Sequence, residues 1–90
     1  MDAARLSFPA SHPAFPGHFP GAPMVPGALL LAAALQALGA GGPGTRIASA
    51  KFLHPVAPGE SVDVLLSSDG RLELRVAGRL VASAAVRPPA

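Results

Sequence analysis

GALLLAAALQAL, residues 27–38, is the stretch that decides the fold. It consists mainly of strong helix formers and contains no charged residue, which predicts a helix over 27–38. Pro26 suits a helix start, and helix-breaking residues follow in close succession, namely Gly39, Gly41, Gly42, Pro43 and Gly44. Because this helix is apolar on nearly all sides, we expect other elements of the fold to enclose it.

Short strand-like segments follow the helix. Their apolar residues alternate or run continuously between turn signals, which predicts strands near 46–53, 61–67, 71–76 and 79–86. Asp69-Gly70 is a strong hairpin signal and Ala77-Gly78 a weaker one, so the last three strands should run antiparallel. One helix followed by antiparallel strands favours an α+β domain in which the sheet wraps the helix.

The chain before the helix is dense in proline and glycine, which excludes a helix interior or a central strand there. It also carries apolar side chains, among them Phe15, Phe19 and Met24, which favours a loop packed onto the domain over a disordered tail. Ninety residues are expected to form a single domain, residues 1–90.

Composition excludes several classes of function. The net charge is only +2 and there is no Trp or Tyr, so nucleic-acid binding is not expected. Without cysteine, neither disulfides nor thiolate sites can form, and the cytoplasm is the default compartment. The N-terminus has no apolar run of signal-peptide length. The longest apolar run, 28–35, is far shorter than the roughly 20 residues of a membrane span.

Histidine is the residue type best suited to proton transfer near neutral pH, and the chain has three: His12, His18 and His54. His18 is the best placed, in the segment GHFPG shortly before the helix. Nine positions later, Gly27 opens the helix, where free backbone N–H groups can polarise a carbonyl. Taken singly, a loop histidine and a glycine at a helix start are more often structural, but together they form a candidate site.

Carboxylates are absent between Asp2 and Glu60, so the loop and helix cannot supply an acid to His18. Neither a metal-binding motif nor a Ser-His-Asp triad is recognisable. The remaining acids are expected on the surface. The arginines of the last strands either keep the surface soluble or dock an acidic carrier protein; they are Arg71, Arg75, Arg79 and Arg87.

Two segments together resemble the beta-hydroxyacyl-acyl carrier protein dehydratases. The first, HPAFPGHFPGAPMVPGALLLAAALQAL, follows the family pattern GHFPGxPxxPGxLxxEAxxQ, with matches at Gly17, His18, Phe19, Pro20, Gly21, Pro23, Pro26, Gly27, Leu29 and Gln36. The second, AKFLHPVAPGESVDV, is similar to KFxxPVxPGDxL, with matches at Lys51, Phe52, Pro55, Val56, Pro58 and Gly59.

The resemblance implies a hotdog fold, an antiparallel sheet wrapped around one long central helix, in a dimer whose sheets join edge to edge. It implies that His18 acts as base on a 3-hydroxyacyl thioester and that the backbone N–H of Gly27 holds the thioester carbonyl. Further residues in the motif are expected to contact substrate: Phe19, Pro20, Gly21, Pro26, Ala32 and Gln36. An acyl carrier protein is the implied partner, and no cofactor is expected.

One position departs from the family pattern, because Ala32 occupies the place of the helix acid that normally protonates the departing hydroxyl from the other protomer. Losing such an acid typically costs on the order of 10²–10⁴ in rate. Three explanations stay open. The protein is a slow dehydratase aided by water or Gln36, or it pairs with a related subunit whose helix supplies the acid. Alternatively, it is a non-catalytic acyl- and carrier-binding subunit or a thioesterase.

Overall fold

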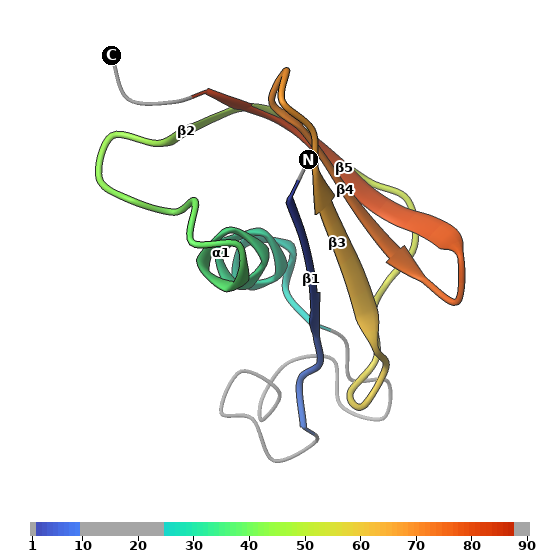
Figure 1. The fold of residues 1–90 in the computed structure, drawn as a ribbon. Helices are drawn as coiled ribbons and strands as arrows, with labels where there is room; N and C mark the ends of the chain where they lie inside the picture. The colour runs from blue at the N-terminus through green and yellow to red at the C-terminus, as the bar shows by residue number, and fades with distance from the viewer. Residues whose placement is uncertain (1, 10–24, 88–90) are drawn as a thin grey trace.

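One antiparallel sheet and one helix make up the part of the chain that the computed structural model describes, residues 2–9 and 25–87 (Figure 1). The helix precedes most of the sheet, and the elements are β1 (Asp2–Leu6), α1 (Gly27–Ala37), β2 (Arg46–Phe52), β3 (Val62–Leu66), β4 (Arg71–Val76) and β5 (Arg79–Arg87). The strand order is β1-β3-β4-β5-β2, with every neighbouring pair antiparallel.

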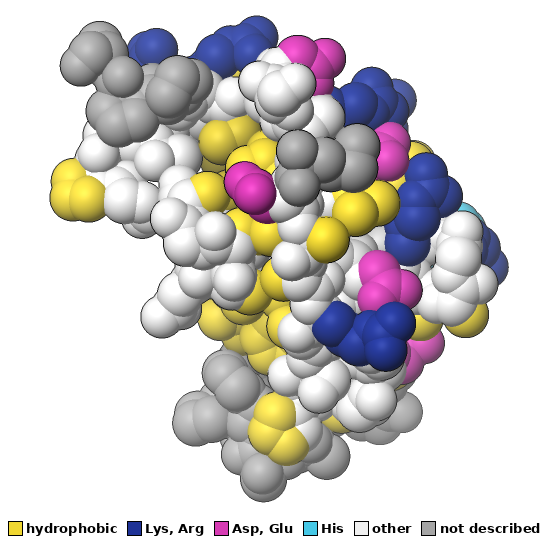
Figure 2. All heavy atoms as spheres, viewed as in Figure 1, with side chains coloured by type: hydrophobic (Ala, Val, Ile, Leu, Met, Phe, Trp, Pro, Cys, Tyr) yellow, Lys and Arg dark blue, Asp and Glu magenta, His cyan; other side chains and the backbone are white. Residues whose placement is uncertain are grey.

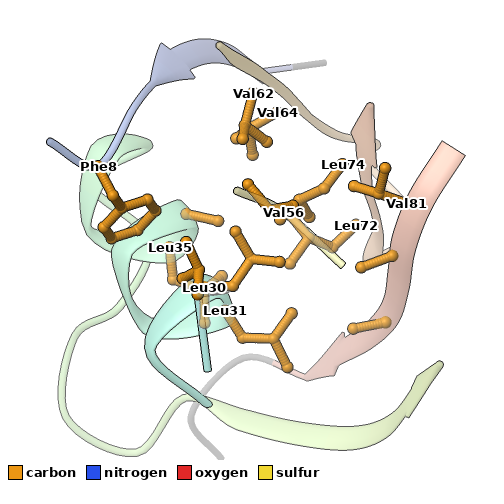
Figure 3. Close-up of a cluster of buried hydrophobic side chains, with 14 of the residues drawn as sticks. Phe8, Leu30, Leu31, Leu35, Val56, Val62, Val64, Leu72, Leu74 and Val81 are labelled. Carbon is orange, nitrogen blue, oxygen red and sulfur yellow. The ribbon is translucent and has the colours of Figure 1, made fainter. Parts of the chain in front are cut away.

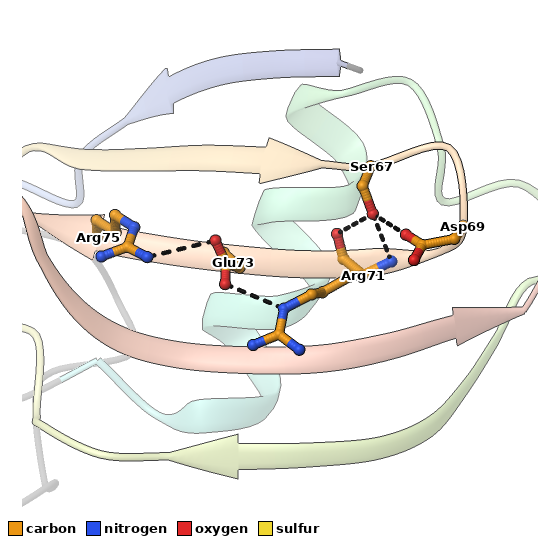
Figure 4. A network of polar contacts seen from close by, with 5 residues as sticks. All are labelled: Ser67, Asp69, Arg71, Glu73 and Arg75. Carbon is orange, nitrogen blue, oxygen red and sulfur yellow. Dashed lines mark hydrogen bonds and ion pairs between the residues drawn. The ribbon is translucent and has the colours of Figure 1, made fainter.

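Alternation along the strands separates an inner face of the sheet from an outer one. Val64 on β3 pairs with Leu74 on β4, and both are fully buried. Arg71 and Glu73 point to the opposite, solvated face, as the period of two in a strand requires (Figure 4). The helix packs onto the inner face and contributes Leu30, Leu31, Ala34 and Leu35 to the core (Figure 3).

The predicted elements are confirmed to within one residue at each end, including the helix at 27–38, which ends at Ala37. Both hairpin turns are confirmed as well, so the last three strands run antiparallel. The first strand was missed. β1 is an edge strand that forms by pairing with β3, and Arg5 on it bonds Asp63 at 2.8 Å. Because β3 lies some sixty residues further along the chain, the local sequence pattern around β1 does not indicate this pairing.

The expectation that other elements enclose the helix is wrong for the single chain. Ala28, Ala32 and Gln36 are exposed and form the face of α1 turned away from the core, and Ala37 is exposed at the C-terminal end of the helix. Small side chains can lie against a sheet or a partner equally well, so their apolar character did not show which side the sheet would cover. The helix spans eleven residues, about three turns.

β2 is the other exposed element. It pairs only with β5, and all seven of its residues are exposed, so both of its faces and one of its edges are uncovered. Ile47 and Phe52 are 41% and 51% exposed, large values for apolar side chains. An uncovered edge strand and an uncovered helix face on one chain are typical of a protein that associates.

The Asp69-Gly70 turn requires glycine. Gly70 has φ +88°, and a Cβ there would collide with the carbonyl oxygen of Val86, whose N–H donates to the Gly70 carbonyl at 2.8 Å. Gly70→Ala should therefore lower the free energy of unfolding by roughly 3 kcal/mol. Urea unfolding followed by circular dichroism measures this change, and Gly42→Ala, where a Cβ would meet open space, is the control.

In the Ala77-Gly78 turn, by contrast, a residue other than glycine adopts a left-handed conformation. Ala77 has φ +51° and Gly78 φ +81°, the paired positive values of a type I′ turn, in which asparagine is favoured over alanine at the first position. Ala77→Asn should raise the free energy of unfolding by about 0.5–1 kcal/mol because it relieves a left-handed alanine. An unchanged or lower urea midpoint would show that the turn is not strained.

Candidate functional site

The start of α1 is held in place by the segment before it. Val25 is buried, and its N–H donates to the Val56 carbonyl at 2.8 Å, which ties the helix entry to the chain between β2 and β3. Pro26 then takes an extended ψ of 139° as the N-cap, and its carbonyl accepts the N–H of Leu30 at 2.9 Å. The first N–H groups of a helix have no intrahelical acceptor, and here no side chain caps them.

Gly27 lies directly under the ring of Phe52. A Cβ at Gly27 would fall 2.8 Å from the Phe52 ring, so the absence of a side chain is what allows the aromatic ring to approach the helix start. Phe52 ends β2 and is half exposed, so its ring covers the helix start from the solvent side. The arrangement brings the described part of the first motif, 25–36, against the second motif, 51–59.

A cavity of about 490 Å³ opens at this point. Its lining is apolar apart from His54, which belongs to the segment between β2 and β3, and the lining residues are Val25, Gly27, Ala28, Leu30, Phe52, Leu53, His54, Pro55 and Val56. A cavity with a helix N-terminus at its wall suits a ligand with an apolar body and one carbonyl to polarise.

A second cavity, of about 780 Å³, runs along the exposed face of α1 toward the start of β2. Ala28 lines both cavities, so the two meet at the first turn of the helix. Ala32 and Gln36 lie one and two turns further on the same face, and the full lining is Ala28, Leu31, Ala32, Leu35, Gln36, Gly39, Gly41, Gly42, Thr45 and Ile47. Together the cavities form a long, open groove beside the helix.

Neither cavity has a carboxylate among its lining residues in the described ranges. His54 is the only ionisable side chain among these lining residues, and Gln36 and Thr45 supply neutral hydrogen-bonding groups. Within the same ranges, no group of histidine and carboxylate side chains is arranged to hold a metal ion. The groove alone therefore lacks the acid that a dehydration needs.

The described carboxylates whose pKa is shifted lie instead on the outer side of the sheet and in its hairpin (Figure 4). Hydrogen bonds from Arg71 and then from Arg75, at 3.0 and 3.4 Å, lower the pKa of Glu73. A hydrogen bond from the Ser67 hydroxyl lowers the pKa of Asp69. Both carboxylates stay ionised at neutral pH and have structural partners, as expected for surface acids.

The predicted site residues divide into two sets. Gly27, Ala32 and Gln36 line the two cavities of the groove, and Pro26 is the N-cap of the helix beside it. His18, with Phe19, Pro20 and Gly21, lies outside the described residues, so its position beside Gly27 stays a prediction. His54 was named among the three histidines and Phe52 among the motif matches, but neither was placed at the site. The KFLHPV segment that contains them was recognisable in the sequence. Its position beside the helix start, however, depends on the pairing of β2 with β5.

Comparison with protein families decides the assignment. The family model of ApeI-like proteins, described as ApeI dehydratase, matches residues 2–84, nearly the whole chain. The chain belongs to the ApeI-like dehydratase family. It is thus a hotdog-fold protein related to the beta-hydroxyacyl-acyl carrier protein dehydratases, as the resemblance implied.

Curated relatives of this ApeI-like chain carry the name 3-hydroxyacyl-[acyl-carrier-protein] dehydratase FabZ. The protein of Protochlamydia amoebophila is 45% identical over 83 residues, covering 80% of this chain and 52% of the relative. That of Rhodopseudomonas palustris is 35% identical over 97 residues, covering 84% of this chain and 64% of the relative. The chain therefore spans about half to two thirds of the length of these relatives.

Solved structures of similar fold include the dehydratase heterocomplex ApeI:P from Xenorhabdus doucetiae, with a TM-score of 0.68 at 23% identity. The match covers 94% of this chain and 83% of that one. An uncharacterised protein from Erwinia carotovora subsp. atroseptica gives a TM-score of 0.63 at 22% identity, covering 96% and 82%. At these identities the likeness is one of fold. In the described part of the chain, no helix is both long and apolar enough to span a bilayer.

Proposed function

We propose that the chain is one half of a dehydratase acting on 3-hydroxyacyl thioesters of an acyl carrier protein. In this proposal it supplies the base and the carbonyl-binding end of the helix, and a second hotdog subunit supplies the acid. The observation that carries the proposal is the exposed face of α1, where Ala32 borders a cavity of about 780 Å³ that has no carboxylate in its described lining.

The chemistry divides between the subunits as follows. The His18 imidazole removes the α-proton of the acyl chain, and the electron pair of that C–H bond forms the new double bond. The backbone N–H of Gly27 donates to the thioester oxygen, which gains negative charge as the proton leaves. The C–O bond at the 3-position breaks, and the hydroxyl leaves as water after taking a proton from the partner's acid. The product is the trans-2-enoyl thioester.

Two copies of this chain would not complete such a site, because each would present Ala32 where the acid is needed. A different subunit with an acid on its helix would complete the site that contains this chain's His18. The exposed helix face and the uncovered edge of β2 leave room for such a partner. The name of the ApeI:P heterocomplex supports the same arrangement, because it describes a dehydratase built from two different chains.

Reconstitution tests the proposal. The chain alone is expected to turn over a 3-hydroxyacyl-carrier thioester slowly or not at all, and mixing it with an acid-bearing hotdog subunit should produce the enoyl thioester, measured by its ultraviolet absorbance. Native mass spectrometry of the mixture should show a mixed assembly. Full activity of the chain alone, or a mixture no faster than its separate components, would contradict the proposal. Release of free carrier instead of enoyl product would indicate a thioesterase.

A further inference from the structure

A β-bulge at Ala48 sorts the side chains of β2 between the two faces of the sheet. Side chains alternate along a strand, and the extra residue of a bulge shifts that alternation by one position. Because of this shift, three apolar residues pair with buried partners on β5 and share the inner face; they are Ile47, Ala50 and Phe52. Ile47 also lines the larger cavity, so the apolar side of β2 continues the uncovered face of α1.

The outer side of β2 is cationic. Arg46 and Lys51 are exposed, and their partners on β5, Arg87 and Ser83, are not buried. Neither of the two β2 cations has an ion-pair partner among the described residues, and β2 and β5 contain no carboxylate. In Figure 2, Lys and Arg side chains gather at the top of the molecule, where Figure 1 shows β5 ending beside β2.

The charges of β2 disfavour pairing between two copies of the chain. In an antiparallel pairing, the two-fold axis between two sheets keeps both outer faces on the same side. Arg46 and Lys51 of both copies would therefore lie along one stretch of about 20 Å, the length of this seven-residue strand, with no carboxylate of β2 or β5 between them. Lysine and a β-bulge are also features by which edge strands avoid pairing with their own kind.

We propose that β2 selects a different hotdog subunit, one whose pairing strand carries carboxylates on its outer face, over a second copy of this chain. The inference rests on the proposed function for the existence of a second subunit, and on charge complementarity for its chemistry. Opposite charges across two strands stabilise their pairing and like charges destabilise it, so the two cations of β2 favour an acidic strand roughly tenfold. The apolar inner side attracts either partner, whereas the outer charges discriminate between them.

Pairing of the chain with its own charge-reversed form tests this selection. The double variant Arg46→Glu/Lys51→Glu presents an acidic strand and keeps the apolar inner side unchanged. In a mixture with isotopically labelled unaltered chain, the dissociation constant of the mixed dimer should be roughly tenfold lower than that of either dimer of identical chains. Native mass spectrometry over a range of concentrations measures all three species, and the preference should shrink as salt rises from about 0.05 to 0.5 M.

Lys51→Glu and Arg79→Glu are matched single changes, because both reverse one exposed cation. Arg79 lies at the Ala77-Gly78 turn, outside the ladder between β2 and β5. Lys51→Glu should pair with the unaltered chain about threefold more tightly than it pairs with itself, whereas Arg79→Glu should show no preference beyond the statistical one. Circular dichroism verifies that each variant is folded, and if the double variant is not, Lys51→Glu decides by itself.

The same two single variants test the selection in the reconstituted mixed assembly. Lys51→Glu should raise the dissociation constant for the acid-bearing subunit about threefold or more and leave kcat at saturating partner unchanged, whereas Arg79→Glu should alter neither. The experiments with charge-reversed chains require no turnover. If no assembly dehydrates its substrate, the proposed function fails, and the three dissociation constants still decide the selection.

Three results would overturn the selection by charge. One is a mixed dimer that forms no more tightly than the dimers of identical chains. Another is an equal preference in Lys51→Glu and Arg79→Glu, which would indicate diffuse attraction between chains of different net charge. The third is the absence of any dimer in the mixture with the double variant, which would mean that β2 is not a pairing edge.

Discussion

Ala32→Glu is expected to raise the dehydration rate of the chain on its own by on the order of 10²–10⁴. Ala32 is exposed on the free face of α1 and borders the larger cavity, so a longer side chain fits there without displacing the core. In a dimer of the variant, each glutamate would reach the site that the other copy's His18 and Gly27 form. The expected gain equals about 3–5 kcal/mol of barrier lowering.

Ala37→Glu is the control for this gain. It places the same charge at another exposed position of the same helix, but Ala37 lines neither cavity. Enoyl product is measured for both variants against the unaltered chain. If Ala32→Glu remains as inactive as Ala37→Glu although native mass spectrometry shows a dimer, the rest of the site is not competent, and the reading as a carrier-binding subunit without catalysis is favoured.

His18→Ala in the reconstituted mixed assembly is expected to lower turnover by on the order of 10²–10⁴, because the proposed mechanism assigns removal of the α-proton to its imidazole. The loss should fall mainly on kcat, since the groove that holds the acyl chain is formed by other residues.

His12→Ala is the matched control for this loss, because it removes an imidazole from the same proline-rich segment at a position outside the family motif. Added imidazole should restore part of the lost rate in His18→Ala if the side chain acts only as a proton acceptor. Activity that survives His18→Ala, or an equal loss in His12→Ala, would mean that His18 is not the base and that His54 is the histidine to test next.

The helix and four of the five strands could be predicted because their signals are local. Residues 27–38 combine helix formers with clear stop signals, and the strands alternate between turn signals. β1 could not be predicted in this way, since DAARL becomes a strand only through its ladder with β3. The position of β2 at the far edge, beside β5, is likewise a long-range outcome, which no property of 46–52 alone indicates.

The candidate site was predictable to the extent that its residues belong to one motif. Ala32 and Gln36 are four residues apart, so their common face of the helix follows from spacing, and Pro26 and Gly27 mark the helix start. Phe52 and His54 join them only because the end of β2 crosses the helix start. The groove exists because the sheet covers only one face of the helix. Since the helix is apolar on nearly all sides, its composition did not show which face that would be, and the expectation that other elements enclose it was wrong.

By itself, the sequence determined the kind of chemistry: which residues can transfer protons, that the loop and helix contain no acid, and which turns need glycine. These are properties of covalent structure and local conformation. The tertiary structure alone decided which side of α1 is uncovered, that Phe52 lies on Gly27, and that Arg46 and Lys51 share the outer side of β2. Such arrangements arise from strand register and packing between distant segments, whose free energies are sums over many contacts that no local pattern contains.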